Sequence, residues 1–278
     1  MNRIAIVTNE IKDKDLLFAK KIRDSIEKKY PDVQVSITEM NEVSKNTIGQ
    51  AKCIMVLGGD GTMLRVAKDT IDFDIPLIGI NLGAVGFLAE VEQNNIDEAI
   101  KLLIADEYNL ETRMMLEGSV VREGQVIKKQ VALNDVVLSR RGDLQLIGYR
   151  VLVNGTYLND FYADGIILST PTGSTGYNMS AGGSIVEPMA ILIMLTPVCP
   201  HTLSTRSIVL SASDKVEVMI LPPKGNKESE VGAYFDGGQS EIISQGDSVI
   251  IEKSAKSIKL CRLSSQSFLE ILQKKMNE

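Results

Sequence analysis

The short motif Gly58-Gly59-Asp60-Gly61-Thr62 constrains the fold of this chain more than any other stretch. An apolar run over residues 53–57 leads into it, and a helical pattern over residues 63–69 follows. This order predicts a buried strand, a tight turn and a helix, and such turns at the carboxyl ends of parallel strands are where α/β proteins bind ligands. The glycines let backbone N–H groups approach a polyphosphate closely, and a helix amino terminus favours anions.

Asp60 is the one carboxylate among the backbone N–H groups that are expected to donate hydrogen bonds to phosphate. A carboxylate repels phosphates unless it binds a metal or accepts a proton from an attacking hydroxyl, which would make Asp60 a general base. The alternative is a helix N-cap, because Asp and Gly are ordinary cap residues. For this turn taken alone, the N-cap is the commoner explanation.

Periodicity extends the α/β pattern over the first 110 residues. Apolar strands are predicted over residues 3–8, 33–37, 51–57 and 76–80, and helices over residues 13–29 and 96–104. Strands that alternate with helices imply a parallel sheet with right-handed crossovers. The strand over residues 76–80 also ends in a glycine-containing loop, residues 81–88, so two glycine loops are expected at one edge of the sheet.

The pattern changes near Leu110. Between residues 114 and 253, short branched runs alternate with turns, and Asn154-Gly155 is a strong signal for a two-residue hairpin. We therefore predict an α/β domain over residues 1–110 and an all-β, sandwich-like domain over residues 111–253. The strand and helix expected over residues 254–278 return to the first domain.

Residues 169–183 form a second unusual stretch, which is dense in hydroxyls and glycines. A flexible linker is the plain alternative, but Pro171, Tyr177, Asn178 and the bracketing apolar runs favour an ordered polar loop at an interdomain cleft. Hydroxyl and amide groups there suit ribose and adenine edges. A P-loop motif is absent, and no GxGxxG follows the first strand, so a dinucleotide would not bind in the ordinary Rossmann mode.

Asn134 and Asp135 form a polar pair between apolar runs. A β-bulge or turn is the ordinary explanation for such a pair. The functional alternative is that both side chains point into the cleft.

Composition excludes several classes of function. The 278 residues have a net charge of −6 with no basic run, which argues against nucleic-acid binding. The longest strongly apolar segment, residues 189–195, is too short for a membrane span, and the amino terminus has no signal-peptide pattern. Three distant cysteines make neither a disulfide framework nor a zinc spacing and are expected to be small buried residues. We expect a cytoplasmic protein.

Taken together, these stretches resemble the NAD kinase family. The resemblance extends from the first strand to the turn at residues 237–239, and GGDGT by itself is shared with diacylglycerol kinases. The motifs in chain order are Gly58 to Thr62, Asn81-Leu82-Gly83 with Gly86-Phe87-Leu88, Leu133-Asn134-Asp135, Asp164-Gly165, Thr170 to Tyr177, and Thr196 to Ser204 followed by Arg206.

The resemblance implies transfer of the terminal phosphoryl of ATP, or of polyphosphate, to the adenosine 2′-hydroxyl of NAD, giving NADP. It implies a two-domain fold whose interdomain cleft binds the dinucleotide, and a homo-oligomer, either a dimer or a tetramer. A divalent cation, Mg²⁺ or Mn²⁺, would arrive with the phosphoryl donor rather than in a protein cage.

The resemblance also assigns roles to residues. Asp60 matches the proton acceptor, and Arg65 falls where the family often has a basic residue near the phosphates. The nucleotide-binding positions in the first domain are Gly58, Gly59, Gly61, Thr62, Asn81, Gly83 and Phe87. Those in the second domain are Asn134, Asp135, Tyr162, Asp164, Thr172, Ser174, Thr175, Gly176, Tyr177, Asn178, Ser180 and Gln239.

Two rival functions share some of these features. A lipid kinase of the diacylglycerol type has the same glycine turn, but it needs an apolar cavity, and the polar loop suits a dinucleotide instead. A non-catalytic NAD-sensing module would bind NAD without consuming ATP.

Overall fold

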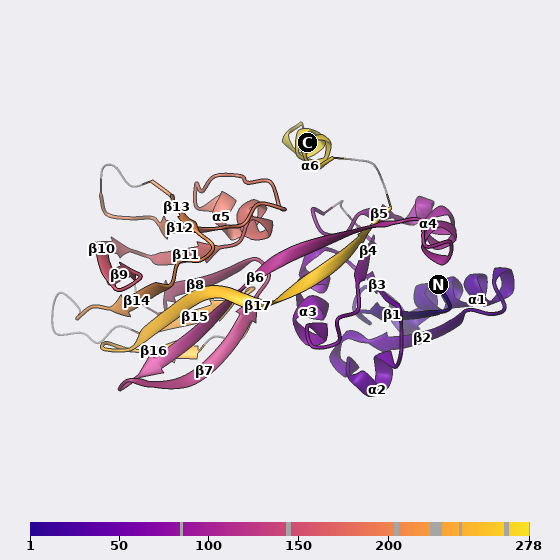
Figure 1. Ribbon diagram of the computed structural model, residues 1–278, viewed down its shortest axis with the longest axis horizontal. Helices are drawn as coiled ribbons and strands as arrows, with labels where there is room; N and C mark the ends of the chain where they lie inside the picture. The colour runs from indigo at the N-terminus through magenta and orange to yellow at the C-terminus, as the bar shows by residue number, and fades with distance from the viewer. Residues whose placement is uncertain are drawn as a thin grey trace. The chain divides into compact units, whose positions relative to one another are not determined.

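A computed structural model describes residues 1–83, 86–142, 146–202, 206–222, 230–238, 241–263 and 267–277. Its contacts divide the chain into two compact units: unit 1 is Met1–Arg113 with Ser257–Glu278, and unit 2 is Met114–Lys256 (Figure 1). Two long strands, β6 (Asn109–Arg122) and β17 (Ser248–Arg262), contribute residues to both units. The domain boundaries expected from the sequence, after residues 110 and 253, remain a prediction.

Unit 1 is built on a parallel sheet. Its strands are β1 (Arg3–Thr8), β2 (Gln34–Glu39), β3 (Cys53–Leu57) and β4 (Leu77–Asn81), in the order β2-β1-β3-β4, with the short β5 (Val91–Glu92) and the end of β17 beside β4. Every residue of β3 and β4 is buried. Continuous apolar strands are typical of a parallel sheet that is covered on both faces.

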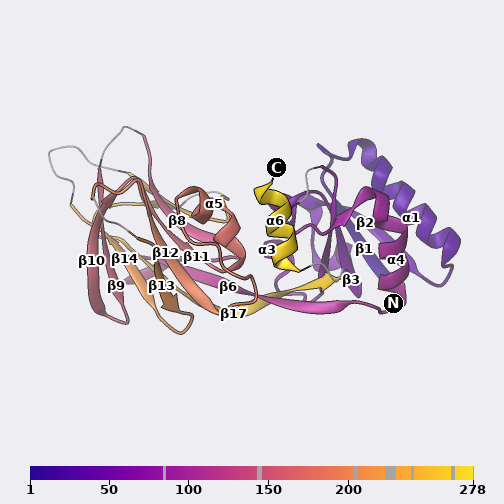
Figure 2. The ribbon, with the colours of Figure 1, turned by 90° about the horizontal axis from the view of Figure 1, so that it is seen from above.

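Helices cover this sheet. They are α1 (Leu17–Lys29), α2 (Lys45–Ile48), α3 (Asp60–Thr70) and α4 (Ile96–Ile104). The last helix of the chain, α6 (Phe268–Met276), has no buried residue. Buried residues of α1 and α4 share one apolar cluster with one face of the strands, and Figure 2 shows these two helices on the same side of the sheet. The buried residues of α3 lie outside that cluster.

Parallel pairing places the two glycine loops at one edge. Leu57, the last residue of β3, lies opposite Ile80 of β4, so the loops that follow these strands leave the same edge of the sheet. The parallel sheet predicted from the sequence is therefore confirmed. The helix after the glycine turn begins at Asp60, three residues before the apolar pattern indicated.

Unit 2 consists of antiparallel strands in two layers. One layer has the order β10-β9-β14-β17 with β6 and β7, and the other has the order β13-β12-β11-β8-β15-β16. The strand bounds are β7 (Gln125–Ala132), β8 (Asp135–Arg140), β9 (Ile147–Val153), β10 (Thr156–Ala163), β11 (Gly165–Ser169), β12 (Leu192–Val198), β13 (Ile208–Ser211), β14 (Val216–Ile220), β15 (Val231–Phe235) and β16 (Glu241–Ile243).

A single apolar core joins the two layers of unit 2. It includes Tyr149 and Val218 from one layer and Leu138, Ile166 and Phe235 from the other. This arrangement confirms the predicted sandwich-like β fold. The predicted hairpin also forms between β9 and β10, where Asn154 and Gly155 have φ values of 51° and 78°, and two successive positive φ values are typical of a type I′ turn.

Three local predictions differ from the structure. The strands expected separately near residues 248–252 and 257–262 are one strand, β17. The hydroxyl-rich stretch contains a 3₁₀ turn over Thr172–Thr175 and a short helix, α5 (Tyr177–Ser180). Cys53 and Cys261 are buried with their Sγ atoms 3.9 Å apart, but Cys199 is exposed, so the prediction that all three cysteines are buried was wrong.

Candidate active site

The Asp60 carboxylate lies at the start of α3 but does not cap the helix. Gly59 occupies the N-cap position, and no side chain caps the first turn. The carboxylate instead accepts three backbone hydrogen bonds, from the N–H groups of Phe87 at 2.8 Å, Leu88 at 3.1 Å and Ala89 at 3.2 Å. Asp60 therefore ties the turn after β3 to the loop after β4.

Two glycines make this close approach possible. A Cβ at Gly86 would overlap the Asp60 carboxylate, and a Cβ at Gly58 would overlap the side chain of Thr62. Only a residue without a side chain fits at these two positions. The Gly86-Phe87-Leu88 motif is thus explained by its contact with the glycine turn.

Other predicted residues of unit 1 are occupied in local contacts. The Asn81 side chain is buried, and its Oδ1 accepts the Gly83 N–H at 2.8 Å. The exposed Arg65 donates from Nη2 to Asn41 Oδ1 at 2.7 Å. Gly61 is exposed on the first turn of α3. Their assignment as nucleotide contacts stays a prediction.

Sequence reasoning missed Lys12. Its Nζ lies 3.8 Å from the point that a Cβ on Gly59 would occupy. Among the residues described, the exposed Lys12 ammonium has no hydrogen-bond or ion-pair partner. The position of Lys12 in the loop just after β1 could have indicated this, because β1 is the parallel neighbour of β3 and Thr8 lies opposite Leu57. The loop after β1 therefore leaves the same sheet edge as the glycine turn.

In unit 2, a buried turn presents Asn134 and Asp135. The carboxylate of Asp236 accepts the N–H groups of Leu133 at 2.7 Å, Asn134 at 2.7 Å and Asp135 at 3.2 Å. On the other side, Thr170 donates its hydroxyl to the Leu133 carbonyl at 2.6 Å and its N–H to the Asn134 carbonyl at 2.8 Å. The pair is thus part of a turn that is held by Asp236 on one side and by Thr170 on the other.

The side chains of this pair have unused acceptor atoms. Asn134 Oδ1 is buried and has no hydrogen-bond partner within the described ranges. Asp135 is 5% exposed, and burial, together with the neighbouring Asp236 carboxylate, raises its pKa to about 7. Because buried acceptors without partners are rare, the pair suits the hydroxyl donors of a ligand.

The hydroxyl-rich loop is ordered by its own side chains. Ser174 Oγ exchanges hydrogen bonds with the backbone of Val186, at 3.1 Å to the carbonyl and 3.0 Å from the N–H. Asn178 accepts from Thr196 Oγ1 at 2.7 Å and donates to the Ser184 carbonyl at 3.1 Å. Both side chains are fully buried. These contacts favour the ordered loop over the linker alternative.

The loop also borders the Asn134-Asp135 pair. A Cβ on Gly176 would lie 3.2 Å from Asn134 Nδ2 and 3.9 Å from Asp135 Oδ2. Tyr177 and Ser180 are exposed, Thr175 is half-buried and Thr172 is buried. The structure therefore brings the pair and the start of the hydroxyl-rich loop together within unit 2.

The remaining predicted positions of unit 2 lie near strand ends. Asp164, between β10 and β11, accepts from Arg140 Nε at 2.9 Å. The carbonyl of Tyr162 accepts the His201 N–H at 2.8 Å. Gln239 lies outside the described residues.

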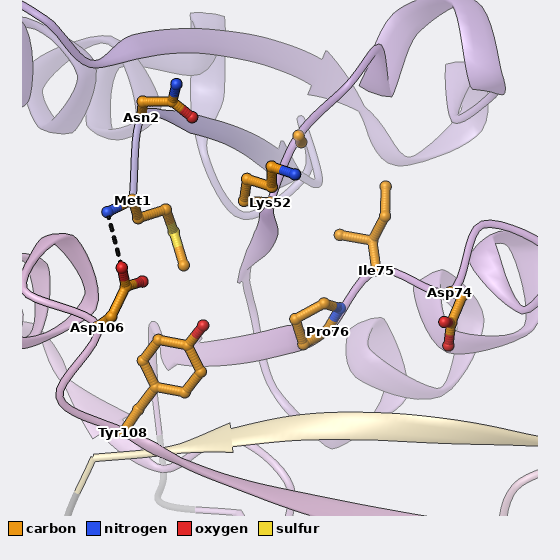
Figure 3. Close-up of a pocket in the computed structure, with 9 residues that line it drawn as sticks. Met1, Asn2, Lys52, Asp74, Ile75, Pro76, Asp106 and Tyr108 are labelled. Carbon is orange, nitrogen blue, oxygen red and sulfur yellow. Dashed lines mark hydrogen bonds and ion pairs between the residues drawn. The ribbon is translucent and has the colours of Figure 1, made fainter.

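A separate cavity of about 710 Å³ opens at the opposite edge of the unit 1 sheet. Lys52, Pro76 and Tyr108 are among its lining residues, near the amino ends of β3 and β4 (Figure 3). It contains none of the predicted site residues. Within the described parts of the chain, no group of three or more His, Cys, Asp or Glu side chains is placed to hold a metal.

A glycine turn with a fixed carboxylate at the carboxyl edge of a parallel sheet, in a chain that also forms a β-sandwich unit, is the arrangement expected of a kinase, and the family models agree with it. The model of the ATP-NAD kinase N-terminal domain matches residues 3–108, and that of the C-terminal domain matches residues 133–263. The chain belongs to the NAD kinase family, which is a family of phosphotransferases.

Individual relatives agree with this assignment. The chain is 42% identical over 282 residues to the NAD kinase of Agathobacter rectalis, with 99% of each chain covered. It is 39% identical over 288 residues to that of Lachnoclostridium phytofermentans, with 100% of each covered. These matches favour the NAD kinase assignment over the diacylglycerol kinase alternative.

Solved structures share the fold. A yeast NADH kinase complexed with NADH superposes with a TM-score of 0.89 at 22% identity, covering 100% of this chain and 88% of that one. An NAD kinase from Archaeoglobus fulgidus in complex with ATP gives a TM-score of 0.79 at 25% identity, with 99% of each chain covered.

Replacing Gly86 by alanine should displace the Asp60 carboxylate, because the new Cβ would occupy its place. With Asp60 as the general base that the family resemblance implies, we expect kcat to fall by about 10²-fold, the cost of misplacing such a group. Steady-state kinetics on the folded variant measures this. The control is Gly124→Ala, which strains a positive φ of 76° at the β6–β7 turn and should lower stability while leaving kcat unchanged. Equal kcat values for the two variants would contradict the Asp60 tether.

The raised pKa of Asp135 predicts a pH-dependent stability. The carboxyl is protonated in both folded and unfolded chains below about pH 4, and its contribution to the free energy of unfolding is lost as pH rises through its folded pKa of about 7. The slope should reach about 1.4 kcal/mol per pH unit between these values. Urea unfolding of wild type and Asp135→Asn from pH 4.5 to 7.5 isolates this slope as the difference between the two proteins. Parallel curves would show that Asp135 titrates normally.

Proposed function

We propose that this protein transfers the terminal phosphoryl of ATP, or of polyphosphate, to the adenosine 2′-hydroxyl of NAD to form NADP. The observation that carries the proposal is the Asp60 carboxylate, held by three backbone N–H groups beside the glycine turn. A carboxylate offers about four acceptor positions. Three are occupied here, and the fourth remains for the hydroxyl that loses its proton.

Asp60 acts as the general base in this proposal. The 2′-hydroxyl is a poor nucleophile at neutral pH, and Asp60 accepts its proton as the bond to phosphorus forms. The three N–H groups hold the base at one position, so alignment supplies much of the rate enhancement.

The donor phosphates bind to the glycine turn of unit 1. Exposed N–H groups at the amino terminus of α3 attract anions, and the Lys12 ammonium lies over Gly59. These positive groups offset the charge that develops on the transferred phosphoryl. A divalent cation, Mg²⁺ or Mn²⁺, enters as part of the donor, because such ions prefer phosphate oxygens and water.

The dinucleotide binds to the residues of unit 2. Asn134 Oδ1 and the Asp135 carboxyl are buried acceptors beside the hydroxyl-rich loop, and both suit ribose hydroxyls. Asp164, Tyr162, Tyr177 and the residues from Thr172 to Ser180 complete this set as predicted contacts.

We also propose a cytoplasmic homo-oligomer, a dimer or a tetramer. The net charge of −6 and the absence of a disulfide spacing support this compartment. None of the described helices is long and apolar enough to cross a membrane. Size-exclusion chromatography with light scattering measures the assembly.

The direct test is product analysis with ATP or polyphosphate as donor and NAD or NADH as acceptor, in a two-by-two design. NADP formation is read by coupling to an NADP-specific dehydrogenase. Binding of NAD in a calorimeter with no ATP consumption would favour the non-catalytic sensing module instead.

Asp60→Asn should lower kcat by about 10²-fold or more, because an amide cannot accept the proton. Coupled NADP formation measures kcat, and circular dichroism shows that the variant is folded. The control is Asp24→Asn on the exposed face of α1, which should retain wild-type activity. Full turnover by Asp60→Asn would remove Asp60 from its assigned role.

Lys12→Ala should raise the KM for ATP about tenfold with a smaller change in kcat, because a hydrogen bond to a charged group is lost. Initial rates over a range of ATP concentrations measure both constants. Lys14→Ala removes another exposed ammonium two residues further on and should leave the KM unchanged. If the two variants have the same KM, Lys12 does not contact the donor.

A further inference from the structure

Asp236 lies directly after β15 in a left-handed conformation, with φ 51°. Its own N–H donates to the Asp135 carbonyl at 3.1 Å. Its carboxylate accepts hydrogen bonds from the N–H groups of the turn at residues 133–135. Oδ2 accepts from Leu133, and Oδ1 accepts from Asn134 and Asp135. One side chain therefore satisfies all three backbone donors of this turn, which would otherwise be buried without partners.

The opposite side of the turn is equally constrained. Ser169 Oγ donates to the Asn134 carbonyl at 3.2 Å, and Thr170 donates to the carbonyls of both Leu133 and Asn134. Gly173 packs so closely that a Cβ there would overlap the Asn134 carbonyl oxygen. The turn is held between Asp236 on its N–H side and the end of β11 on its carbonyl side.

A turn fixed in this way determines where its side chains point. Asn134 Oδ1 has no partner among the described residues, so its orientation is set by the backbone and not by hydrogen bonds of its own. The same holds for the Asp135 carboxyl, for which no hydrogen-bond donor lies in the described part of the chain.

We propose that Asp236 is a positioning residue for the dinucleotide: its carboxylate holds residues 133–135 so that the side chains of Asn134 and Asp135 meet the ribose hydroxyls. This inference rests on the proposed function and deepens it. Asp236 acts through the turn and does not itself contact the reacting atoms.

Asp236 has a second effect, through charge. Burial and the like charge of Asp236 keep the proton on Asp135 up to about pH 7, and within the described ranges the phenol of Tyr177 in α5 also faces Asp135. Ionised Asp135 accepts two hydroxyl donors, whereas the protonated form accepts fewer. NAD affinity should therefore fall as pH drops below 7.

The test is Asp236→Asn, which keeps the shape but replaces one acceptor oxygen by an NH₂ group that faces backbone N–H donors. The KM for NAD should rise about tenfold, while kcat changes much less. Amide hydrogen exchange at residues 133–135 should quicken. The pH at which NAD affinity falls should move lower, because the like charge beside Asp135 is gone.

The matched control is Asp247→Asn. Asp247 is another aspartate of unit 2, buried where Asp236 is half-buried, and it accepts the Ser244 N–H at 2.9 Å and pairs with Arg122. This variant should lose stability but keep the wild-type KM for NAD and the wild-type pH profile. A purely structural role for Asp236 would make the two variants alike and would overturn the proposal.

If Asp236→Asn does not fold, two measurements on the wild-type protein can still test the tether and the proposed function. Fast exchange at the amides of residues 133 and 134 in the intact protein would overturn the tether. NADP formation by the same protein tests the proposed function separately, so a slow-exchanging turn in a protein that makes no NADP would refute only the function.

Discussion

The tether between the Asp60 carboxylate and three consecutive N–H groups is the interaction on which the site depends. It joins the loops that leave β3 and β4. Gly86 leaves room for the Asp60 carboxylate, because a Cβ at this position would overlap it. A loop of this kind has backbone donors that no sheet or helix satisfies. A single carboxylate satisfies three of them and is itself fixed by them. The carboxylate and the loop therefore hold each other in place.

The same device appears in unit 2. Asp236 binds the N–H groups of residues 133–135 as Asp60 binds those of residues 87–89. The two aspartates differ in what they control. Asp60 is the reactive group of the proposed mechanism, whereas Asp236 leaves the acceptors of Asn134 and Asp135 free for a ligand. Irregular backbone is thus made rigid where a substrate needs fixed partners.

Burial also divides the polar residues by role. Ser174 and Asn178 look like ligand contacts in the sequence, but their side chains are buried and bonded to Val186 and Thr196, which follow the loop. They order the loop, and the exposed or unpartnered groups beside them remain for recognition. Arg65 likewise contacts Asn41, while the unpredicted Lys12 lies over the glycine turn. Residue type therefore does not show which polar side chains are bonded internally and which remain available to a ligand.

The sequence by itself determined the parallel sheet, the β-sandwich, the Asn154-Gly155 hairpin and the glycine turn, because each depends on periodicity or turn chemistry among neighbouring residues. Tertiary structure alone decided that helix α3 begins at Asp60, that Asp60 is a tether and not a cap, that the Asp236 carboxylate binds the turn at residues 133–135, and that the Lys12 ammonium lies over Gly59. The partners of Asp60 are 27 to 29 residues away, and those of Asp236 are 101 to 103 residues away. Local patterns contain no information on contacts at such separations, which arise only when the strands have paired.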